Sequence, residues 1–300
     1  MVAFKPLSTF GVETSDVDLS QPLSDAAFKT LETAFYANQV LALRGQDITA
    51  AQFAAFARRL GPPQPHVIDQ FHHPEDPNIL ILSNVRQDGQ PTGLQDAGSY
   101  FHTDYSYLQV PARATTLYSR VVPKVGGNTL FANQLAAYDD LSEAMKKLID
   151  PLLAVHHYGN RQNLDEASRT VASVLSAEQK ARMPVITHRI ARPHPITGRK
   201  ALYAVSGSSF GIVGMPDDEA RCLLDELAAH ATQAKYQLSF HYGVGDVVVW
   251  DNAALLHSAT LTDPNDARTL WRITVLEVDE DAAAPAVLAT SLAASGAQRA

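Results

Sequence analysis

The sequence of 300 residues has little of several features on which common classes of protein depend. It holds one cysteine, Cys222, which excludes an intrachain disulfide framework and a zinc site built from thiolates. No stretch reaches the roughly 18 apolar residues of a membrane span, and the N-terminus lacks the basic and apolar regions of a signal peptide. We therefore expect a cytoplasmic protein with no membrane contact, in which Cys222 is a small buried side chain of a helix.

The sequence also has no basic run. Acidic residues outnumber basic ones by 32 to 24, which gives a formal charge of −8 and disfavours nucleic acid as a partner. Hydrophobic residues make up 46% of the chain and charged residues 19%, so the chain can form a sizeable core.

No Gly/Ser-rich or Pro-rich linker divides the chain, which predicts a single domain over residues 1–278. Residues 279–300 are low in complexity, and we expect them to form a flexible tail. The stretch from about 150 to 200 is irregular and polar, which is typical of a lid-like insertion in a compact domain.

Helices are expected at four places. Ser24 precedes apolar residues at helical spacing, and Thr49 with Gln52 fits a capping box. Further helical patterns cover about 135–148 and 217–233.

Strand patterns outnumber these helices. Short segments rich in β-forming residues, bounded by Gly, Pro, Asn or Asp, occur at 39–44, 78–85, 112–122, 127–133, 201–205, 236–242, 246–252 and 268–278. They do not alternate with helices, so we expect a mainly β protein with flanking helices (α+β), built as an antiparallel sandwich or barrel and not as a doubly wound parallel sheet.

A metal site is the first candidate for chemistry. In an extended strand, His102 and Asp104 would point to the same face and could bind one ion together. A facial iron site needs a second histidine and leaves three positions open, and the best candidate is His257, which follows a buried strand that ends at an Asp-Asn turn. The alternative is that His257 is a structural side chain, because histidine is commonly half-buried.

Two arginines supply the second candidate site. Under strand alternation Arg268 and Arg272 share one face. That face is either a solvated outer surface or the mouth of a barrel, where buried guanidinium groups require anions. Arginine suits bidentate pairing with carboxylate, sulfonate or phosphonate groups.

The order and spacing of these motifs resemble the TauD/TfdA family of Fe(II)- and 2-oxoglutarate-dependent dioxygenases, from about residue 4 to residue 278. The motifs are FHTD at 101–104, GNT at 127–129, WDN at 250–252 with His257, and Arg268.

The resemblance implies a double-stranded β-helix, or jelly roll, with iron at one end. It implies that His102, Asp104 and His257 are the metal ligands. It also implies that Arg268 and the hydroxyl of Thr129 hold the distal carboxylate of 2-oxoglutarate.

The resemblance further implies that Arg272 and His66 contact an anionic prime substrate: a sulfonate, carboxylate or phosphonate. The expected reaction consumes O₂, hydroxylates the substrate and releases succinate and CO₂, and the expected assembly is a homo-dimer or tetramer. At Asp69 and Gly98 the chain lacks a tyrosine and an asparagine of the taurine enzyme, which argues against taurine.

Two other readings of the sequence stay open at this point. Gly207–Gly211 fits the G-x-S-x-G pattern of serine hydrolases, with Ser209 as nucleophile and His257 as base, although Ile212–Pro216 does not begin the helix that this motif requires. The third class is a jelly-roll binding protein without catalysis.

Overall fold

The computed structural model describes residues 2–95, 98–158 and 184–278. The predicted tail at 279–300 lies outside the described residues, as does the middle of the predicted lid-like insertion.

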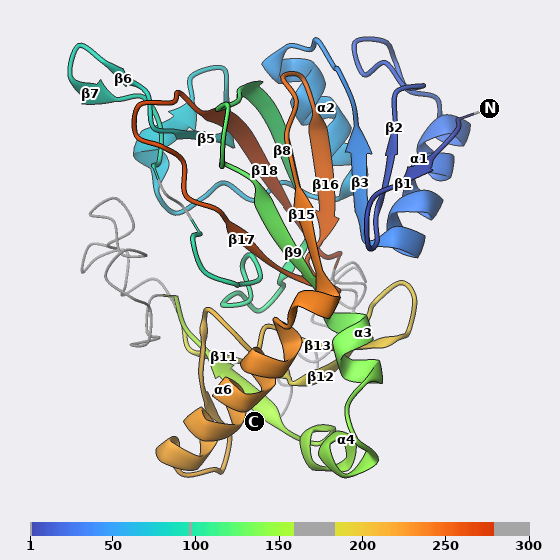
Figure 1. The fold of residues 1–300 in the computed structure, drawn as a ribbon, viewed down its shortest axis with the longest axis vertical. Coiled ribbons are helices and arrows are strands. Elements are labelled where there is room, and N and C mark those ends of the chain that lie inside the picture. The colour runs from blue at the N-terminus through green and yellow to red at the C-terminus, as the bar shows by residue number, and fades with distance from the viewer. Residues whose placement is uncertain (1, 96–97, 159–183, 279–300) are drawn as a thin grey trace, which may run out of the picture.

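A large sheet of eight strands forms one side of the upper part in Figure 1. In spatial order its strands are β1 (Lys5–Pro6), β2 (Val12–Thr14), β3 (Val40–Leu43), β16 (Val247–Asp251), β8 (Ala112–Val121), β18 (Thr269–Leu276), β5 (Asp76–Ser83) and β4 (His72–His73). A smaller sheet consists of β15 (Gln237–Phe240), β9 (Thr129–Asn133) and β17 (Leu255–Ala259). All pairs in these two sheets are antiparallel except β2 with β3.

The inner faces of these two sheets enclose one hydrophobic core. The large sheet contributes side chains such as Leu117 and Trp250, and the small sheet contributes Phe131, Phe240 and Leu255. On β8 and β16 the side chains of alternate residues, such as Leu117, Val248 and Trp250, point into this layer, as expected of a pleated sheet. The arrangement confirms the predicted mainly β class.

The outer face of the large sheet is covered by α1 (Asp25–Asn38) and α2 (Ala50–Leu60) (Figure 1). The Ser24 hydroxyl accepts a hydrogen bond from the Ala27 amide, and Thr49 and Gln52 form the predicted capping box. Both predicted helix starts are confirmed, because these caps satisfy amides that have no partner within the helix.

The lower part of the molecule holds the remaining elements (Figure 1). They are α3 (Gln134–Asp139), α4 (Glu143–Ile149), α6 (Asp217–Ala231), a sheet of β10 (Leu153–His156), β11 (Ile186–Arg189) and β14 (Ser209–Ile212), and the pair β12 (Ala191–Pro193) and β13 (Lys200–Leu202). Outside this part lie β6 (Arg86–Gln87) and β7 (Gln90–Pro91) (Figure 1). Short 3₁₀ turns occur at Asp69–Phe71 and at Ala234–Tyr236, and Tyr236 packs against α3 and α6.

Three details differ from the expectations. The helix predicted over 135–148 is two helices, because Ser142 caps a new one by accepting from the Met145 amide. The described parts of 150–200 contain regular strands. Cys222 is exposed, since Leu223, Leu224 and Leu227 take the inward face of α6.

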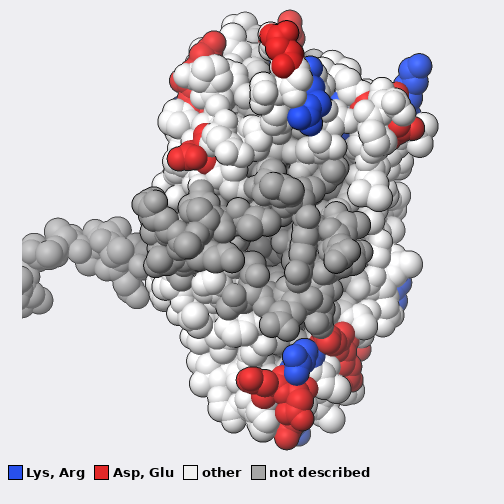
Figure 2. All heavy atoms as spheres, turned by 90° about the vertical axis from the view of Figure 1, so that its left-hand side faces the viewer, with Lys and Arg blue, Asp and Glu red and all other residues white. Residues whose placement is uncertain are grey.

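Charged side chains of both signs occur together on the face shown in Figure 2, where they gather toward its upper and lower ends. Among the described residues, no helix combines the length and apolar character that crossing a lipid bilayer requires.

Candidate active site

The two histidines of the predicted metal site are joined through their main chains. His102 and His257 form an isolated antiparallel bridge in which each amide donates to the other's carbonyl oxygen, at 2.9 and 2.8 Å. His257 lies on β17 opposite Phe131 of β9, so its side chain enters the space between the sheets. The bridge therefore fixes both histidines relative to one sheet.

Asp104 does not lie on a strand, which corrects the expectation of an extended His-x-Asp segment. After the bridge at His102 the chain turns, and Tyr105 has a φ of 51°. The side chains still converge: His102 Nε2 lies 3.8 Å from Asp104 Oδ1, and His257 Nε2 lies 3.7 Å from Asp104 Oδ2.

Within the described part of the chain, His102, Asp104 and His257 are the one group whose ligand atoms could hold a metal ion, all within 4.8 Å of one another. His102 Nδ1 lies 2.8 Å from the Tyr100 carbonyl oxygen, so Nδ1 carries the proton and Nε2 presents its lone pair to the cluster. Burial lowers the pKa of His102, and it lowers the pKa of His257 to about 3. Both imidazoles are therefore neutral, the form that binds a metal.

The carboxylate is held ionised by its surroundings. Burial by itself would raise the pKa of Asp104, but the Arg272 guanidinium, the two neighbouring histidines and the Thr115 hydroxyl together outweigh burial and hold this pKa well below its usual range. Arg272 Nη1 lies 3.5 Å from Asp104 Oδ1. The Thr115 hydroxyl donates to Asp104 Oδ2 at 2.6 Å, and the Asn252 side-chain amide donates to Thr115 Oγ1 at 2.9 Å.

Two glycines leave room for the His102 side chain. A Cβ on Gly98 would lie 2.6 Å from His102 Cε1, and a Cβ on Gly207 would lie 2.7 Å from His102 Cβ. Both glycines also have positive φ angles, 76° and 84°, which other residues rarely adopt. The position of His102 thus depends on the loop that precedes it, at Gly98, and on a segment that is remote in sequence, at Gly207.

His102 and His257 line a pocket between the sheets, and Asp104 lies beside them. The pocket contains about 440 Å³ of space free of protein atoms, part of it open to solvent. Its described walls are Leu82, Leu94, Gly98, His102, Leu117, Thr129, Trp250, His257, Ala259, Arg268 and Arg272. Both arginines face this pocket, so the buried alternative for their strand face is correct and the solvated one is wrong.

Arg268 is held at the edge of the pocket by main-chain and side-chain contacts. Its amide donates to Asn84 Oδ1 at 2.8 Å, and its Nε donates to the Gly127 carbonyl oxygen at 3.2 Å. Thr129 lines the same pocket, and its hydroxyl is hydrogen-bonded to the Tyr242 hydroxyl at 2.7 Å.

Arg272 lies deeper, with 8% of its surface exposed. Its Nη2 atom is buried and has no hydrogen-bond partner in the described part of the chain. A buried N–H without a partner costs about 1–3 kcal/mol, which an incoming anion would recover.

His66 is buried near this arginine but is not among the described side chains that line the pocket. Its ring stacks on Tyr105 with a centroid separation of 6.1 Å, and its Nδ1 accepts from the Ile68 amide at 3.1 Å. Burial, reinforced by the Arg272 charge, lowers the pKa of His66 to about 3.

The serine hydrolase reading is wrong. Ser209 lies on strand β14 and not at a turn into a helix, and the next helix begins at Asp217. The Ser209 hydroxyl is 1% exposed and has no hydrogen-bond partner among the described residues, while His257 faces Asp104.

Sequence reasoning missed the residues that hold the predicted ones in place: Thr115, Tyr242, Gly207 and Asn84. Thr115, Tyr242 and Asn84 carry no local signal, and the G-x-S-x-G pattern that contains Gly207 did not indicate its place beside His102. Asn252 belonged to a motif that we singled out, but its role required knowing that β16 lies beside β8.

Two histidines and one carboxylate that converge in a jelly roll are typical of non-haem iron oxygenases. The chain matches the family described as "Taurine catabolism dioxygenase TauD, TfdA family" over residues 3–274, and it belongs to that family.

Named relatives agree with this family. The chain is 33% identical to an alpha-ketoglutarate-dependent 2,4-dichlorophenoxyacetate dioxygenase of Cupriavidus pinatubonensis, over 91% of this chain and 96% of the relative. It is 32% identical to an (S)-phenoxypropionate/alpha-ketoglutarate-dioxygenase of Sphingobium herbicidovorans, over 88% of this chain and 91% of the relative.

Solved structures are similar over the whole fold. A taurine dioxygenase from Burkholderia xenovorans superposes with a TM-score of 0.75 at 27% identity, over 92% of this chain and 91% of that one. AAD-2 in complex with Mn(II) and N-oxalylglycine superposes with a TM-score of 0.74 at 28% identity, over 93% and 98%. The jelly-roll expectation is confirmed, and the chain is an Fe(II)- and 2-oxoglutarate-dependent dioxygenase that acts on a small anionic substrate. The reading as a binding protein without catalysis is thereby wrong.

Proposed function

We propose that His102, Asp104 and His257 hold the ferrous ion and that Arg268 and Thr129 bind the distal carboxylate of 2-oxoglutarate. The observation that carries this proposal is the convergence of two neutral imidazoles on an ionised carboxylate, beside a pocket that both imidazoles and Arg268 line. When bound, iron and 2-oxoglutarate supply the oxidation chemistry, in which O₂ is consumed, succinate and CO₂ leave, and one oxygen atom enters the substrate.

The remaining residues orient these groups. Thr115 donates to Asp104 Oδ2, the oxygen nearest His257, which leaves Oδ1 to face His102 and Arg272. Main-chain contacts from Gly127 and a side-chain contact from Asn84 fix Arg268. Such supporting contacts reduce the ordering cost of binding and keep the reacting groups aligned.

We further propose that Arg272 binds the anionic group of the prime substrate, with His66 as a buried neighbour. The unpartnered Nη2 of Arg272 supports this role, because a carboxylate can meet the guanidinium edge with two hydrogen bonds. Apolar walls from Leu82, Leu117 and Trp250 favour a substrate with an apolar body.

The substrate class that we favour is an organic acid with an aromatic body. The named relatives that act on 2,4-dichlorophenoxyacetate and (S)-phenoxypropionate support it. Succinate release should be measured with phenoxyacetate, taurine, an alkyl sulfate and an alkylphosphonate. Turnover of taurine or the sulfate, with none of phenoxyacetate, would contradict this choice.

The assignment of the metal and co-substrate residues is tested without a prime substrate. Anaerobic addition of Fe(II) and 2-oxoglutarate should produce a weak visible charge-transfer band, and Asp104→Ala should remove it. Ser209→Ala is the control and should leave the band intact. A band that survives Asp104→Ala would refute the ligand assignment.

A cytoplasmic location and a homo-oligomer, dimer or tetramer, complete the proposal. The demand for ferrous iron and 2-oxoglutarate, both supplied by the cell interior, supports the location. Family resemblance supports the assembly, which sedimentation of the purified protein would test.

A further inference from the structure

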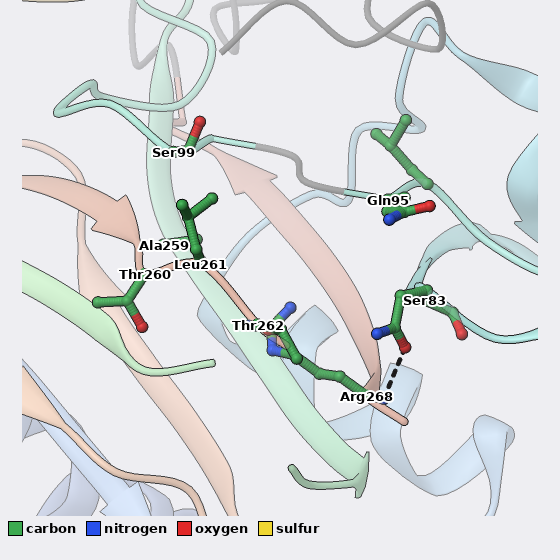
Figure 3. A pocket seen from close by; sticks show the side chains of 10 residues that line it. Ser83, Gln95, Ser99, Ala259, Thr260, Leu261, Thr262 and Arg268 are labelled. Atoms are coloured by element: carbon green, nitrogen blue, oxygen red, sulfur yellow. Dashed lines mark hydrogen bonds between the residues drawn. The ribbon is translucent and has the colours of Figure 1, made fainter. Parts of the chain in front are cut away.

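We call the pocket lined by His102 and His257 the inner pocket. A second pocket, the outer pocket, adjoins it. This outer pocket contains about 380 Å³ of space free of protein atoms, part of it open to solvent. The two pockets share Leu94, Ala259 and Arg268 as walls, so Arg268 stands between them. Figure 3 shows the outer pocket with the Arg268 side chain running along one side of it.

The outer pocket is chemically different from the inner one. Six of its described walls carry uncharged hydrogen-bonding groups: Ser83, Asn84, Gln95, Ser99, Thr260 and Thr262. Arg268 is the one charged side chain among the described walls, and no carboxylate is present there. A pocket with this lining attracts an anion and solvates it by hydrogen bonds on the way to the guanidinium.

Exposure falls from the outer pocket to the inner one. Gln95 and Thr262 are half-exposed, and Leu261 is 68% exposed. In the inner pocket, Thr129 is 3% exposed and Leu117 is 4% exposed. The walls of the outer pocket are thus more exposed than those of the inner pocket, although both pockets are partly open to solvent.

The Arg268 side chain is fixed at this boundary. A Cβ on Gly127 would lie 3.0 Å from Arg268 Cδ and 3.1 Å from its Nε, so the side chain runs closely past this glycine. Arg268 immediately precedes β18, and Arg272 lies within it four residues further along, so an extended chain would place the two Cα atoms about 13 Å apart. Arg272 is the more deeply buried of the two guanidinium groups.

We infer that the outer pocket is a binding subsite and access route for a dicarboxylate, through which 2-oxoglutarate reaches Arg268 and succinate leaves. This inference rests on the proposed roles of Arg268 and Thr129. Because the route ends at Arg268, the diacid exchanges without passing the Arg272 end of the inner pocket.

The experiment fills the outer pocket from two sides. Thr262→Trp and Gln95→Trp each add a large side chain to a wall that is neither a candidate metal ligand nor Arg268. Val244→Trp is the matched control, because Val244 is 69% exposed and lines neither described pocket. Each protein is loaded with Fe(II) without oxygen and mixed with 2-oxoglutarate in a stopped-flow instrument, which follows the charge-transfer band.

An obstructed route slows entry and departure alike. Both filling variants should lower the association and dissociation rate constants about tenfold or more, while Kd changes by less than about threefold. Val244→Trp should match the wild type. Any other pattern overturns the inference, including wild-type association in either filling variant or a raised Kd with unchanged association.

The two proposals fail in different ways. If the wild-type protein forms no band, the proposed function fails and this inference fails with it. If the wild-type band forms and the filling variants do not slow it, the proposed function stands and the route alone is refuted.

Discussion

The Thr115 hydroxyl donates to Asp104 Oδ2 at 2.6 Å, whereas the hydroxyl of the next residue, Thr116, is buried with no partner in the described part of the chain. The two threonines lie side by side on β8 and point to opposite faces of the sheet, one into the site and the other toward the helices. Substituting each threonine in turn therefore tests whether the Thr115 hydrogen bond orients Asp104, the candidate metal ligand.

Thr115→Val should weaken metal binding, because Asp104 loses the hydrogen bond that orients it. Loss of such a supporting contact typically lowers metal affinity about tenfold to a hundredfold. Mn(II) binding followed by electron paramagnetic resonance measures the effect. Thr116→Val should bind Mn(II) as the wild type does; equal losses in both variants would show that β8 acts only through packing.

Gly207→Ala should displace His102. The added methyl group would meet His102 Cβ at 2.7 Å, and the φ of 84° adds strain of about 1–2 kcal/mol. Gly214→Ala is the control, because Gly214 has a φ of 77° but nothing lies within 4 Å of the position that its methyl group would take. Urea unfolding should show a lower free energy of unfolding in both variants, with the larger loss in Gly207→Ala because of the added clash, and Mn(II) affinity should fall only in Gly207→Ala. An unchanged affinity in Gly207→Ala would mean that His102 tolerates the methyl group.

Arg268→Ala should impair binding of 2-oxoglutarate, and Arg272→Ala should impair use of the prime substrate. A charge-assisted hydrogen bond contributes about 1.5–3 kcal/mol, so Arg268→Ala should raise the Kd of 2-oxoglutarate by roughly tenfold to a hundredfold. Arg272→Ala should leave this Kd within a few-fold of the wild type and uncouple succinate release from phenoxyacetate. Mn(II) binding must be measured in parallel, because Arg272 also lies beside Asp104. If either variant changed the Kd of 2-oxoglutarate and the coupling to phenoxyacetate equally, the proposed division of roles between Arg268 and Arg272 would be refuted.

Stability of the metal-free protein should fall as the pH drops below the ordinary imidazole range. Burial lowers the pKa of His66, His156 and His257 to about 3 in the folded chain, while unfolded histidine titrates near 6.5. Between these values the unfolded chain binds more protons, so stability is fully present above about pH 6.5 and is lost as pH falls. Each group contributes a slope of up to about 1.4 kcal/mol per pH unit.

Substitution of His156 isolates the contribution of one histidine to this slope. Its ring is fully buried, and neither ring nitrogen has a hydrogen-bond partner in the described part of the chain. In His156→Leu, urea unfolding at about pH 5 and about pH 6.5 should show a smaller pH dependence by about one proton. An unchanged slope would mean that His156 is solvated or charged in the folded protein.

The sequence by itself determined the elements whose signals are local. The capping box at Thr49 and Gln52 fixed the start of α2, and the runs of β-forming residues marked β8, β16 and β18. These signals depend on neighbours within one turn or one strand, so no tertiary information is needed to read them. Strand alternation also paired Arg268 with Arg272 on one face, although it could not decide whether that face was buried.

The sequence did not mark β17, the strand that carries His257. Its residues Leu255 to Ser258 are all buried, so no alternation of apolar and polar side chains distinguishes the strand from a buried helix. The turn at Asp104 was missed for a related reason, since the bridge from His102 to His257 is a long-range contact.

Tertiary structure alone decided which residues support the site. Thr115 reaches Asp104 from a different segment 11 residues further along, whereas Tyr242 reaches Thr129 and Gly207 makes room for His102 across much larger separations in sequence. Local propensity determines which strands and helices form, but hydrogen bonds and steric fit between distant segments exist only after the two sheets have packed face to face. For this reason the motifs identified the chemistry, and the packed jelly roll decided its geometry.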